Sequence, residues 1–326
     1  MSAESKVSWT IMGKGTDKAM NIRNATLSVF LFVSVALHAA DADLKADVLE
    51  PLDLREVKVG GEIGRRIEVT VANNLLVLEI DKDFLSPFKK GPRTGKFVGL
   101  GMLLDSVVSM AAHTGNPKVL DLKKHLVTEI LKAQEPNGYI GTFPPPKRIK
   151  TLWDVHEMNY VAWGLLQDHR YFGDAASLSA ARRIADYIVK NWSVLPPDWG
   201  HGADVAPHVG FTGLERTMVA LHRVTGEPSY LDFCCKTRAL PSWNLDIVIG
   251  RRPGIEGHVY AYMARCLAQL ELVRQQPDPG LLRPTHRALD FMTRQDGMLV
   301  TGSCGQCEIW TADTDSDVGG GCPRNG

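Results

Sequence analysis

The sequence predicts a mainly α-helical fold: an incomplete (α/α)6 barrel built of helical hairpins, with a few N-terminal β-strands before it. Three observations lead to this prediction. From Gly99 onward the apolar residues recur with the period of helices. Similar separators containing Gly recur about every 55 residues, which is enough chain for one helical hairpin. Before them, residues 55–88 hold short runs in which apolar and polar residues partly alternate, as in strands.

The first 42 residues predict an export signal. Residues 24–40 contain no Asp, Glu, Lys or Arg, Arg23 precedes them, and a small-x-small cleavage pattern ends at Ala42. This uncharged run of 17 residues is shorter than the ~20 that a membrane-spanning helix needs. We therefore expect an exported protein, periplasmic or secreted, with Met20 as a possible start and no membrane attachment after cleavage. An uncleaved N-terminal anchor is the alternative.

Residues 43–96 are expected to contain the strands. The runs VKVGGEIG and RRIEVTV alternate in part, and NNLLVLEI follows an Asn-Asn pair that is typical of a turn. The predicted strands precede the helical domain.

The helical domain is expected to span residues 97–326. Its separators are centred on Gly115, Gly173, Gly226 and Gly280. Each Gly suits the left-handed position just after a helix, and a following Pro suits the first position of the next helix. Six such hairpins would need roughly 330 residues. Because only about four fit here, we expect a barrel that is truncated at the C-terminus.

Composition excludes several classes of function. The chain has 326 residues, and its 37 Lys and Arg balance its 37 Asp and Glu. Zero net charge removes the long-range attraction that drives nucleic-acid binding, so no nucleic-acid partner is expected. Six Cys are too sparse for a small disulfide scaffold. The oligomeric state does not follow from the sequence.

Two helix starts carry titratable pairs. The segment WDVHEM at residues 153–158 places His156 and Glu157 where a helical ring has its rim. In the segment GIEGHVY at residues 254–260, glycines flank Glu256 and His258 and suggest a tight turn that directs these side chains. Both sites also have simpler interpretations. Glu157 can complement a helix dipole with His156 as a polar neighbour of the cap, and His258 can be a core histidine.

A third segment contains Cys304-x-x-Cys307 and Glu308. A single Cys-x-x-Cys is weak evidence for zinc or redox chemistry, because a structural zinc site normally needs four ligands. Glu308 precedes Trp310 by two residues, and a carboxyl against an aromatic face can gain the raised pKa of a general acid. Glu308 is therefore the candidate catalytic acid.

Two loops suit sugar recognition. The segment QEPNGY ends a helix in a turn that is expected to present Tyr139, and His201 and His208 lie in a stretch rich in Gly and Pro. Aromatic rings stack on sugar faces, and imidazoles hydrogen-bond hydroxyls. We therefore expect Tyr139 and His208 to bind substrate.

Together these segments resemble the β-L-arabinofuranosidase family of glycoside hydrolases, family 127. The resemblance rests on QEPNGY, WDVHEM, EGH and GSCGQCE in this order, and it covers residues 60–312. It implies an (α/α)6 barrel followed by β-sandwich domains, with Glu308 as general acid/base. It also implies that His156 and His258 line the sugar pocket, and Glu157, next to His156, is expected to bind substrate with them. A retaining mechanism through a cysteine thiolate held on zinc is implied as well.

The sequence departs from this family in its metal ligands. A Glu-Thr-Cys segment is expected shortly after Glu308, where this chain has GGGCPRNG around Cys322. The later Cys-Cys pair of the family has no counterpart, and Cys234 and Cys235 are expected to be packing residues. The expected zinc ligands are therefore missing, and no metal-ligating residue is assigned.

The resulting prediction is an exported, retaining glycosidase that acts on plant-type or other polysaccharide-derived glycans. Its partner is a carbohydrate substrate. A carbohydrate-binding or structural helical domain without catalysis is the alternative. A polysaccharide lyase or epimerase on the same scaffold is a third possibility, but the neutral charge does not favour a uronate substrate.

Overall fold

The computed structural model describes residues 52–89, 97–192, 209–250, 254–296, 298, 304–305 and 308–311, which belong to one compact unit. The predicted signal region therefore lies outside the described residues. Within them, no helix is both long and apolar enough to cross a membrane.

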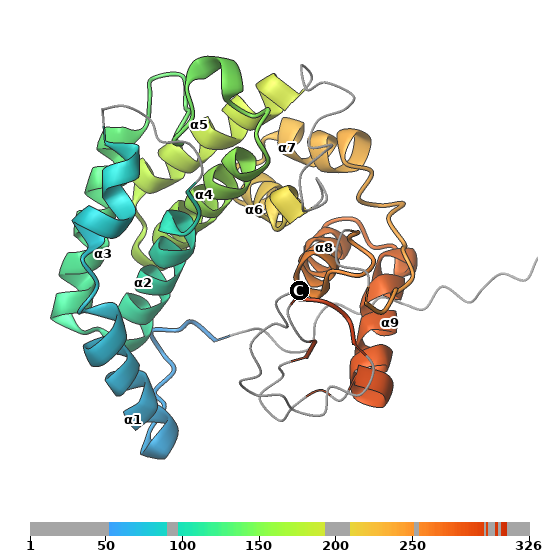
Figure 1. Cartoon of the computed structure of the whole chain (residues 1–326), viewed down its shortest axis with the longest axis horizontal. Helices are drawn as coiled ribbons and strands as arrows, with labels where there is room; N and C mark the ends of the chain where they lie inside the picture. Colours follow the sequence, from blue (N-terminus) through green and yellow to red (C-terminus); the bar gives the residue numbers. More distant parts are fainter. Residues whose placement is uncertain are drawn as a thin grey trace, which may run out of the picture. The chain divides into compact units, whose positions relative to one another are not determined.

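The described residues contain four successive helical hairpins, as the separators predict (Figure 1). Their first helices are α2 (Leu100–Thr114), α4 (Leu152–Phe172), α6 (Leu214–Thr225) and α8 (Val259–Val273). Their second helices are α3 (Pro117–Ala133), α5 (Ala175–Trp192), α7 (Pro228–Asp232) and α9 (Arg283–Phe291).

The hairpins form two layers. The first helices α2, α4, α6 and α8 pack against one another in chain order, and α3, α5 and α7 pack in the same order (Figure 1). This arrangement, with one layer of first helices and one of second helices, is that of an (α/α) barrel. The predicted mainly helical hairpin fold is confirmed.

Three of the four separators behave as predicted. Gly115, Gly173 and Gly226 end α2, α4 and α6 with φ angles of 61°, 71° and 71°, a left-handed conformation that glycine adopts without steric cost. Gly280 differs, because α8 ends at Arg274 in a right-handed conformation. Gly280 instead donates its N–H to the Asp278 carboxylate, at 2.8 Å, in the turn before α9.

The predicted N-terminal strands are wrong. Within the described residues, the segment forms α1 (Gly61–Thr70), which continues into a π-helical turn over Val71–Leu75. Glu62 pairs with both Arg65 and Arg66, three and four residues later, on the helix surface. These helical contacts, together with the burial of Val71 at the end of α1, outweigh the partial alternation. The β pairing in the described residues is a single bridge between His258 and Ile309.

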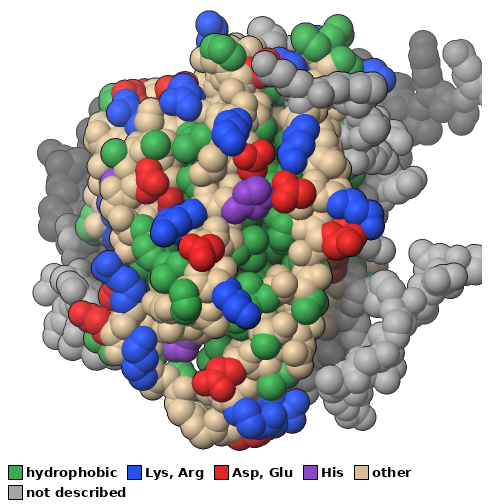
Figure 2. Space-filling model, turned by 90° about the vertical axis from the view of Figure 1, so that its left-hand side faces the viewer, with side chains coloured by type: hydrophobic (Ala, Val, Ile, Leu, Met, Phe, Trp, Pro, Cys, Tyr) green, Lys and Arg blue, Asp and Glu red, His purple; other side chains and the backbone are tan. Residues whose placement is uncertain are grey.

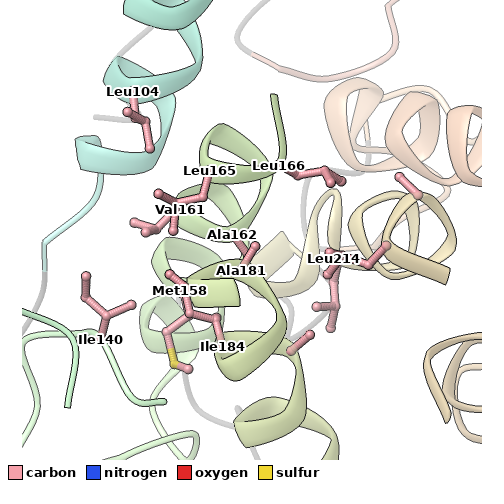
Figure 3. Packing of buried hydrophobic residues seen from close by; sticks show 14 of the residues in the cluster. Leu104, Ile140, Met158, Val161, Ala162, Leu165, Leu166, Ala181, Ile184 and Leu214 are labelled. Carbon is pink, nitrogen blue, oxygen red and sulfur yellow. The ribbon is translucent and has the colours of Figure 1, made fainter. Parts of the chain in front are cut away.

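Two hydrophobic cores support the hairpins. The larger core joins α2, α4 and α5 through side chains such as Leu104, Val161 and Ile184 (Figure 3). The smaller core lies around α8 and α9, where Trp310 is fully buried against Tyr262 and Phe291. On the face drawn in Figure 2, Lys and Arg side chains are interspersed with Asp and Glu. That pattern agrees with the balanced charge of the sequence.

The close packing of α2 against α4 at Gly101 gives a stability prediction. A Cβ added to Gly101 would lie 2.3 Å from the Tyr160 carbonyl carbon. Backbone atoms cannot move aside cheaply, so we expect Gly101→Ala to lower the free energy of unfolding by about 2–3 kcal/mol. Gly115→Ala is the control, because its Cβ meets nothing within 4 Å and only the φ angle opposes it. Its expected cost is about 1 kcal/mol. Urea denaturation measures both, and equal losses would contradict the proposed packing constraint.

Candidate active site

His258 and Glu308 come together at the start of α8. An antiparallel bridge joins His258 to Ile309, and the Val259 N–H donates to the Glu308 carbonyl at 2.9 Å. The Trp310 N–H donates to the Gly257 carbonyl at 3.0 Å. These backbone bonds place the His258 Nε2 atom 3.3 Å from the Glu308 carboxylate. The structure thus pairs two residues that were predicted as site residues from separate segments.

The two side chains of this pair differ in exposure. His258 is 1% exposed, whereas the side chain of Glu308 is 60% exposed. The Ala261 N–H donates to Nδ1 of His258, at 3.3 Å, so the imidazole is the N-cap of α8. In the neutral ring the proton then lies on Nε2, the atom that lies 3.3 Å from the Glu308 carboxylate. A fixed imidazole therefore orients a carboxyl that remains open to solvent.

The backbone at Glu308 has a φ of 68°, a left-handed conformation that costs a non-glycine residue roughly 1–2 kcal/mol. Trp310 offsets this strain by anchoring the segment in the smaller core, with its ring 5.6 Å from Tyr262 and 5.3 Å from Phe291. The sequence suggested instead that Trp310 covers the Glu308 carboxyl. That expectation is corrected, because Trp310 is fully buried and Glu308 is exposed.

Tyr260 completes the group. Its ring lies 6.4 Å from that of His258. Burial raises the pKa of Tyr260 to about 12, and the negative charge of Glu308 adds to this shift. Tyr260 therefore keeps its proton and can donate a hydrogen bond at neutral pH.

His156 lies deeper in the molecule than predicted. It is 3% exposed, between the rings of Trp153 at 5.2 Å and Tyr160 at 4.8 Å. Burial lowers its pKa to about 4, so the imidazole is neutral. Its Nδ1 atom is buried without a hydrogen-bond partner.

Glu157 has a structural role. It is buried, and its carboxyl accepts the N–H groups of Gly99 and Gly101, each at 2.8 Å, at the start of α2. The alternative that Glu157 complements a helix dipole holds, although the helix is the neighbouring α2 and not its own. Burial raises the pKa of Glu157 to about 7, and the backbone N–H groups oppose this shift.

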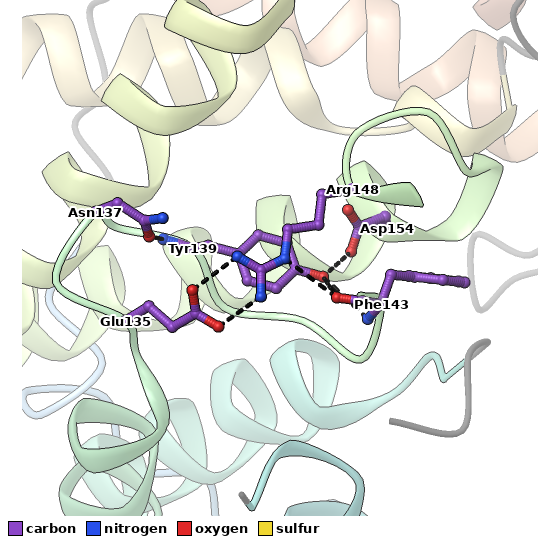
Figure 4. A network of polar contacts seen from close by, with 6 residues as sticks. All are labelled: Glu135, Asn137, Tyr139, Phe143, Arg148 and Asp154. Atoms are coloured by element: carbon purple, nitrogen blue, oxygen red, sulfur yellow. Dashed lines mark hydrogen bonds and ion pairs between the residues drawn. The ribbon is translucent and has the colours of Figure 1, made fainter. Parts of the chain in front are cut away.

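Tyr139 belongs to a buried network (Figure 4). Its hydroxyl donates to Asp154 at 2.8 Å, and the Arg148 guanidinium lies 3.8 Å from the centre of its ring. Arg148 also forms two hydrogen bonds to Glu135, at 2.6 and 2.7 Å. The expectation that the turn presents Tyr139 to a sugar is therefore wrong, because its ring is fully buried. His208, the other loop candidate, lies outside the described residues.

A cavity of about 220 Å³ lies beside this group. Residues of all four first helices line it, among them Asp105, Trp163, Arg216 and Tyr260. Sequence reasoning missed Asp105, Trp163 and Arg216, because each lies within a helix in which the periodic apolar residues dominate the sequence pattern. A charged residue on such a helix is usually solvated, and only the packing of separate hairpins places Asp105 and Arg216 at one cavity.

The described residues do not form a metal site. No three His, Cys, Asp or Glu side chains meet as possible ligands in this part of the chain, and Cys307 and Cys322 lie outside it. Cys234 is buried, and burial raises the pKa of its thiol well above its usual value. A thiol in this state is a poor metal ligand. The residues described therefore do not fit the zinc that the family resemblance implies, and no chemical step is assigned to zinc.

The two layers of hairpins and the exposed carboxyl held by His258 define an (α/α)-barrel protein with a candidate acid/base group beside its first helices. Residues 77–316 match the family described as "Beta-L-arabinofuranosidase, GH127 catalytic domain". The chain therefore belongs to this family. No match was found among curated proteins.

Solved structures share the fold. A GH127 β-L-arabinofuranosidase from Geobacillus stearothermophilus T6 matches with a TM-score of 0.54 and 20% identity, over 78% of this chain and 48% of that one. A GH127 β-arabinofuranosidase matches with a TM-score of 0.54 and 16% identity, over 79% and 47%. A structure described as a glycoside hydrolase matches with a TM-score of 0.52 and 19% identity, over 76% and 37%. This chain thus spans half or less of the length of these proteins.

The opposite pKa shifts of His156 and Glu157 predict opposing effects of pH on stability. Between pH 4.5 and 6.5 the folded state keeps a proton on Glu157 that the unfolded state has lost, so this residue stabilises the fold as pH falls. In the same window the unfolded state protonates His156 and the folded state does not, so this residue destabilises the fold as pH falls. In the wild type the two contributions oppose each other.

Single variants should reveal each contribution. With Glu157→Gln, we expect the free energy of unfolding to fall by up to about 1.4 kcal/mol per unit decrease in pH, relative to the wild type. With His156→Asn, we expect a rise of similar size. Glu68→Gln, at an exposed position of α1, is the control and should follow the wild type. Urea denaturation at several pH values measures these slopes. Identical slopes in all four proteins would disprove the assignment.

The Tyr139 network gives a further prediction. Tyr139→Phe removes the hydroxyl that donates to the buried Asp154 carboxylate, so we expect a loss of about 2 kcal/mol in the free energy of unfolding. Sugar affinity should not change, because Tyr139 is fully buried. Tyr171→Phe is the control, since that hydroxyl bonds to no residue in the described part of the chain. Thermal unfolding and a sugar titration test both statements, and weaker sugar binding at unchanged stability would restore Tyr139 as a binding residue.

Proposed function

We propose that this chain is the barrel portion of an exported, retaining glycoside hydrolase of the β-L-arabinofuranosidase type. Its substrates would be plant-type or other polysaccharide-derived glycans. The observation that carries the proposal is the His258–Glu308 pair, with 3.3 Å between Nε2 and the carboxylate, in a chain of the GH127 family. Export rests on the predicted signal in residues 1–42, and N-terminal sequencing of the protein recovered outside the cytoplasm tests it.

In this proposal Glu308 is the general acid and base. Its carboxyl is exposed, so the oxygen of a glycosidic bond can reach it. As a nucleophile bonds to the sugar carbon and the bond between that carbon and the oxygen breaks, Glu308 gives its proton to the oxygen, and the leaving group departs as an alcohol. The resulting carboxylate then takes a proton from the water that attacks the sugar carbon and displaces the nucleophile. Both proton transfers use the same side chain, as a retaining reaction requires.

His258 is a positioning residue in this scheme. Its Nδ1 atom is held by the Ala261 N–H, so its Nε2 atom faces the Glu308 carboxyl in a fixed direction. A hydrogen bond from Nε2–H stabilises the carboxylate after it has given up its proton. The nucleophile of the retaining reaction is not assigned, because no three His, Cys, Asp or Glu side chains among the described residues are placed to hold a metal with a cysteine ligand.

The first test replaces the acid. We expect Glu308→Gln to lower the hydrolysis of p-nitrophenyl β-L-arabinofuranoside by about 100-fold or more, since general acid catalysis contributes roughly 10²–10⁴. Stability should change little, because the side chain is exposed. Glu62→Gln is a matched control, with a side chain that is also 60% exposed, and should keep wild-type activity. Normal turnover by Glu308→Gln would remove Glu308 from the acid role.

The second test separates positioning from capping. His258→Asn keeps a side-chain acceptor at the N-cap of α8 but loses Nε2–H. We expect kcat to fall about tenfold, with KM and stability nearly unchanged. An unchanged kcat would limit His258 to a structural role. If the wild-type protein binds the glycoside without cleaving it, the alternative of a carbohydrate-binding domain without catalysis is supported instead.

A further inference from the structure

The cavity beside Tyr260 contains a cation, Arg216, for which the described part of the chain provides no hydrogen-bonding partner. The Arg216 guanidinium lies 4.1 Å from the centre of the Trp163 ring, and its Nε atom is buried without a hydrogen-bond partner. Among the described residues, no side chain forms an ion pair with Arg216. Burial lowers the pKa of Arg216, while the charges of Glu271 and Asp105 raise it. A partly buried guanidinium with unused donors needs a polar group that the described residues do not supply.

Acceptors lie in the same cavity. Burial raises the pKa of the Asp105 carboxyl, and the neighbouring Trp163 opposes this shift. Asn159 is 1% exposed and lines the cavity, and its Nδ2 atom donates to the Thr212 carbonyl at 3.1 Å. This bond fixes the orientation of the amide and leaves the Asn159 Oδ1 atom without a partner. The cavity therefore combines donors on α6 with acceptors on α2 and α4.

The cavity adjoins the candidate acid. Tyr260 lines the cavity and is also close enough to Glu308 for the carboxylate charge to raise its pKa. A volume of about 220 Å³ suits one sugar ring and is below the range typical of larger ligands. Each sugar hydroxyl both donates and accepts hydrogen bonds, which matches the unpaired donor and acceptor.

From this juxtaposition we propose that Arg216, Asn159, Asp105 and Trp163 form a binding subsite for one neutral sugar unit beside Glu308. This inference rests on the proposed function, since it names where part of the substrate binds. One cation and one carboxyl line the cavity, so their charges balance; an uncharged ring keeps this balance, whereas a uronate would add an uncompensated negative charge. Arg216 donates to ring hydroxyls, and the Asp105 and Asn159 oxygens accept from them.

The test is a binding measurement that requires no turnover. L-Arabinose is titrated into the full chain by NMR, with Arg216→Gln and Trp163→Leu as variants. We expect both variants to weaken the apparent affinity about tenfold or more, because each removes a partly buried contact to the ring. Arg223→Gln is the matched control, on the same helix but 44% exposed and paired with Glu271, and it should bind as the wild type does. Thermal unfolding of each variant verifies that it is folded.

The outcomes separate this inference from the proposed function. Equal L-arabinose binding by wild type and Arg216→Gln overturns the subsite, as does a lack of binding by the folded wild type. Tighter binding of D-galacturonate than of L-arabinose overturns the assignment to neutral sugars. If Arg216-dependent binding is found while the wild type hydrolyses no glycoside, the subsite stands and the proposed hydrolase function fails.

Discussion

The packing of α2 against α4 determines where the rest of the structure can lie. Gly101 and Gly164 bring the helices so close that a Cβ at either position would lie within 3 Å of the other helix. The Glu157 carboxyl then binds the N–H groups at the start of α2 and fixes its position along α4. The helices α4, α6 and α8 each pack against the first helix that precedes them in the chain. A shift of α2 relative to α4 would therefore change the cavity and the position of α8.

The hairpins are also joined by buried carboxylates. Asp168 of α4 accepts from Lys123 of α3 at 2.8 Å and from Ser177 of α5 at 2.6 Å, so one fully buried group links three helices. Glu215 of α6 pairs with Arg238 at 2.7 Å and with Arg265 of α8 at 3.3 Å. Such groups give their helices a defined register, since breaking one pair would leave a buried charge, at a cost of about 3–5 kcal/mol.

The sequence predicted the parts of the fold that are encoded locally. Gly115, Gly173 and Gly226 were correctly predicted as helix ends, because a left-handed residue after a helix has a local signature. The strand prediction for residues 57–71 failed, because the i,i+3 and i,i+4 ion pairs of Glu62 favour a helix over a partial alternation.

The site depends on contacts that the sequence cannot show. Glu157 and Tyr139 were predicted at the sugar, but each finds a buried partner elsewhere: Gly101 lies 56 residues from Glu157, and Asp154 lies 15 residues from Tyr139. Arg216 carried no signal at all, because its role comes from the Trp163 ring of another hairpin. Local patterns identify the types of residue that can do chemistry, whereas tertiary packing decides which of them reach the cavity.

The candidate acid and the cavity are supported by different parts of the molecule, which constrains how the site can work. Glu308 is held by the smaller core, through Trp310 and the bridge at His258. The cavity is lined by the four first helices, and Tyr260 of α8 belongs to both regions. A sugar bound at Arg216 would therefore be placed by α2, α4 and α6, while its orientation toward Glu308 would depend on α8. The packing of α6 against α8, with the buried pair of Glu215 and Arg265, is the contact that would fix the position of the bound sugar relative to Glu308.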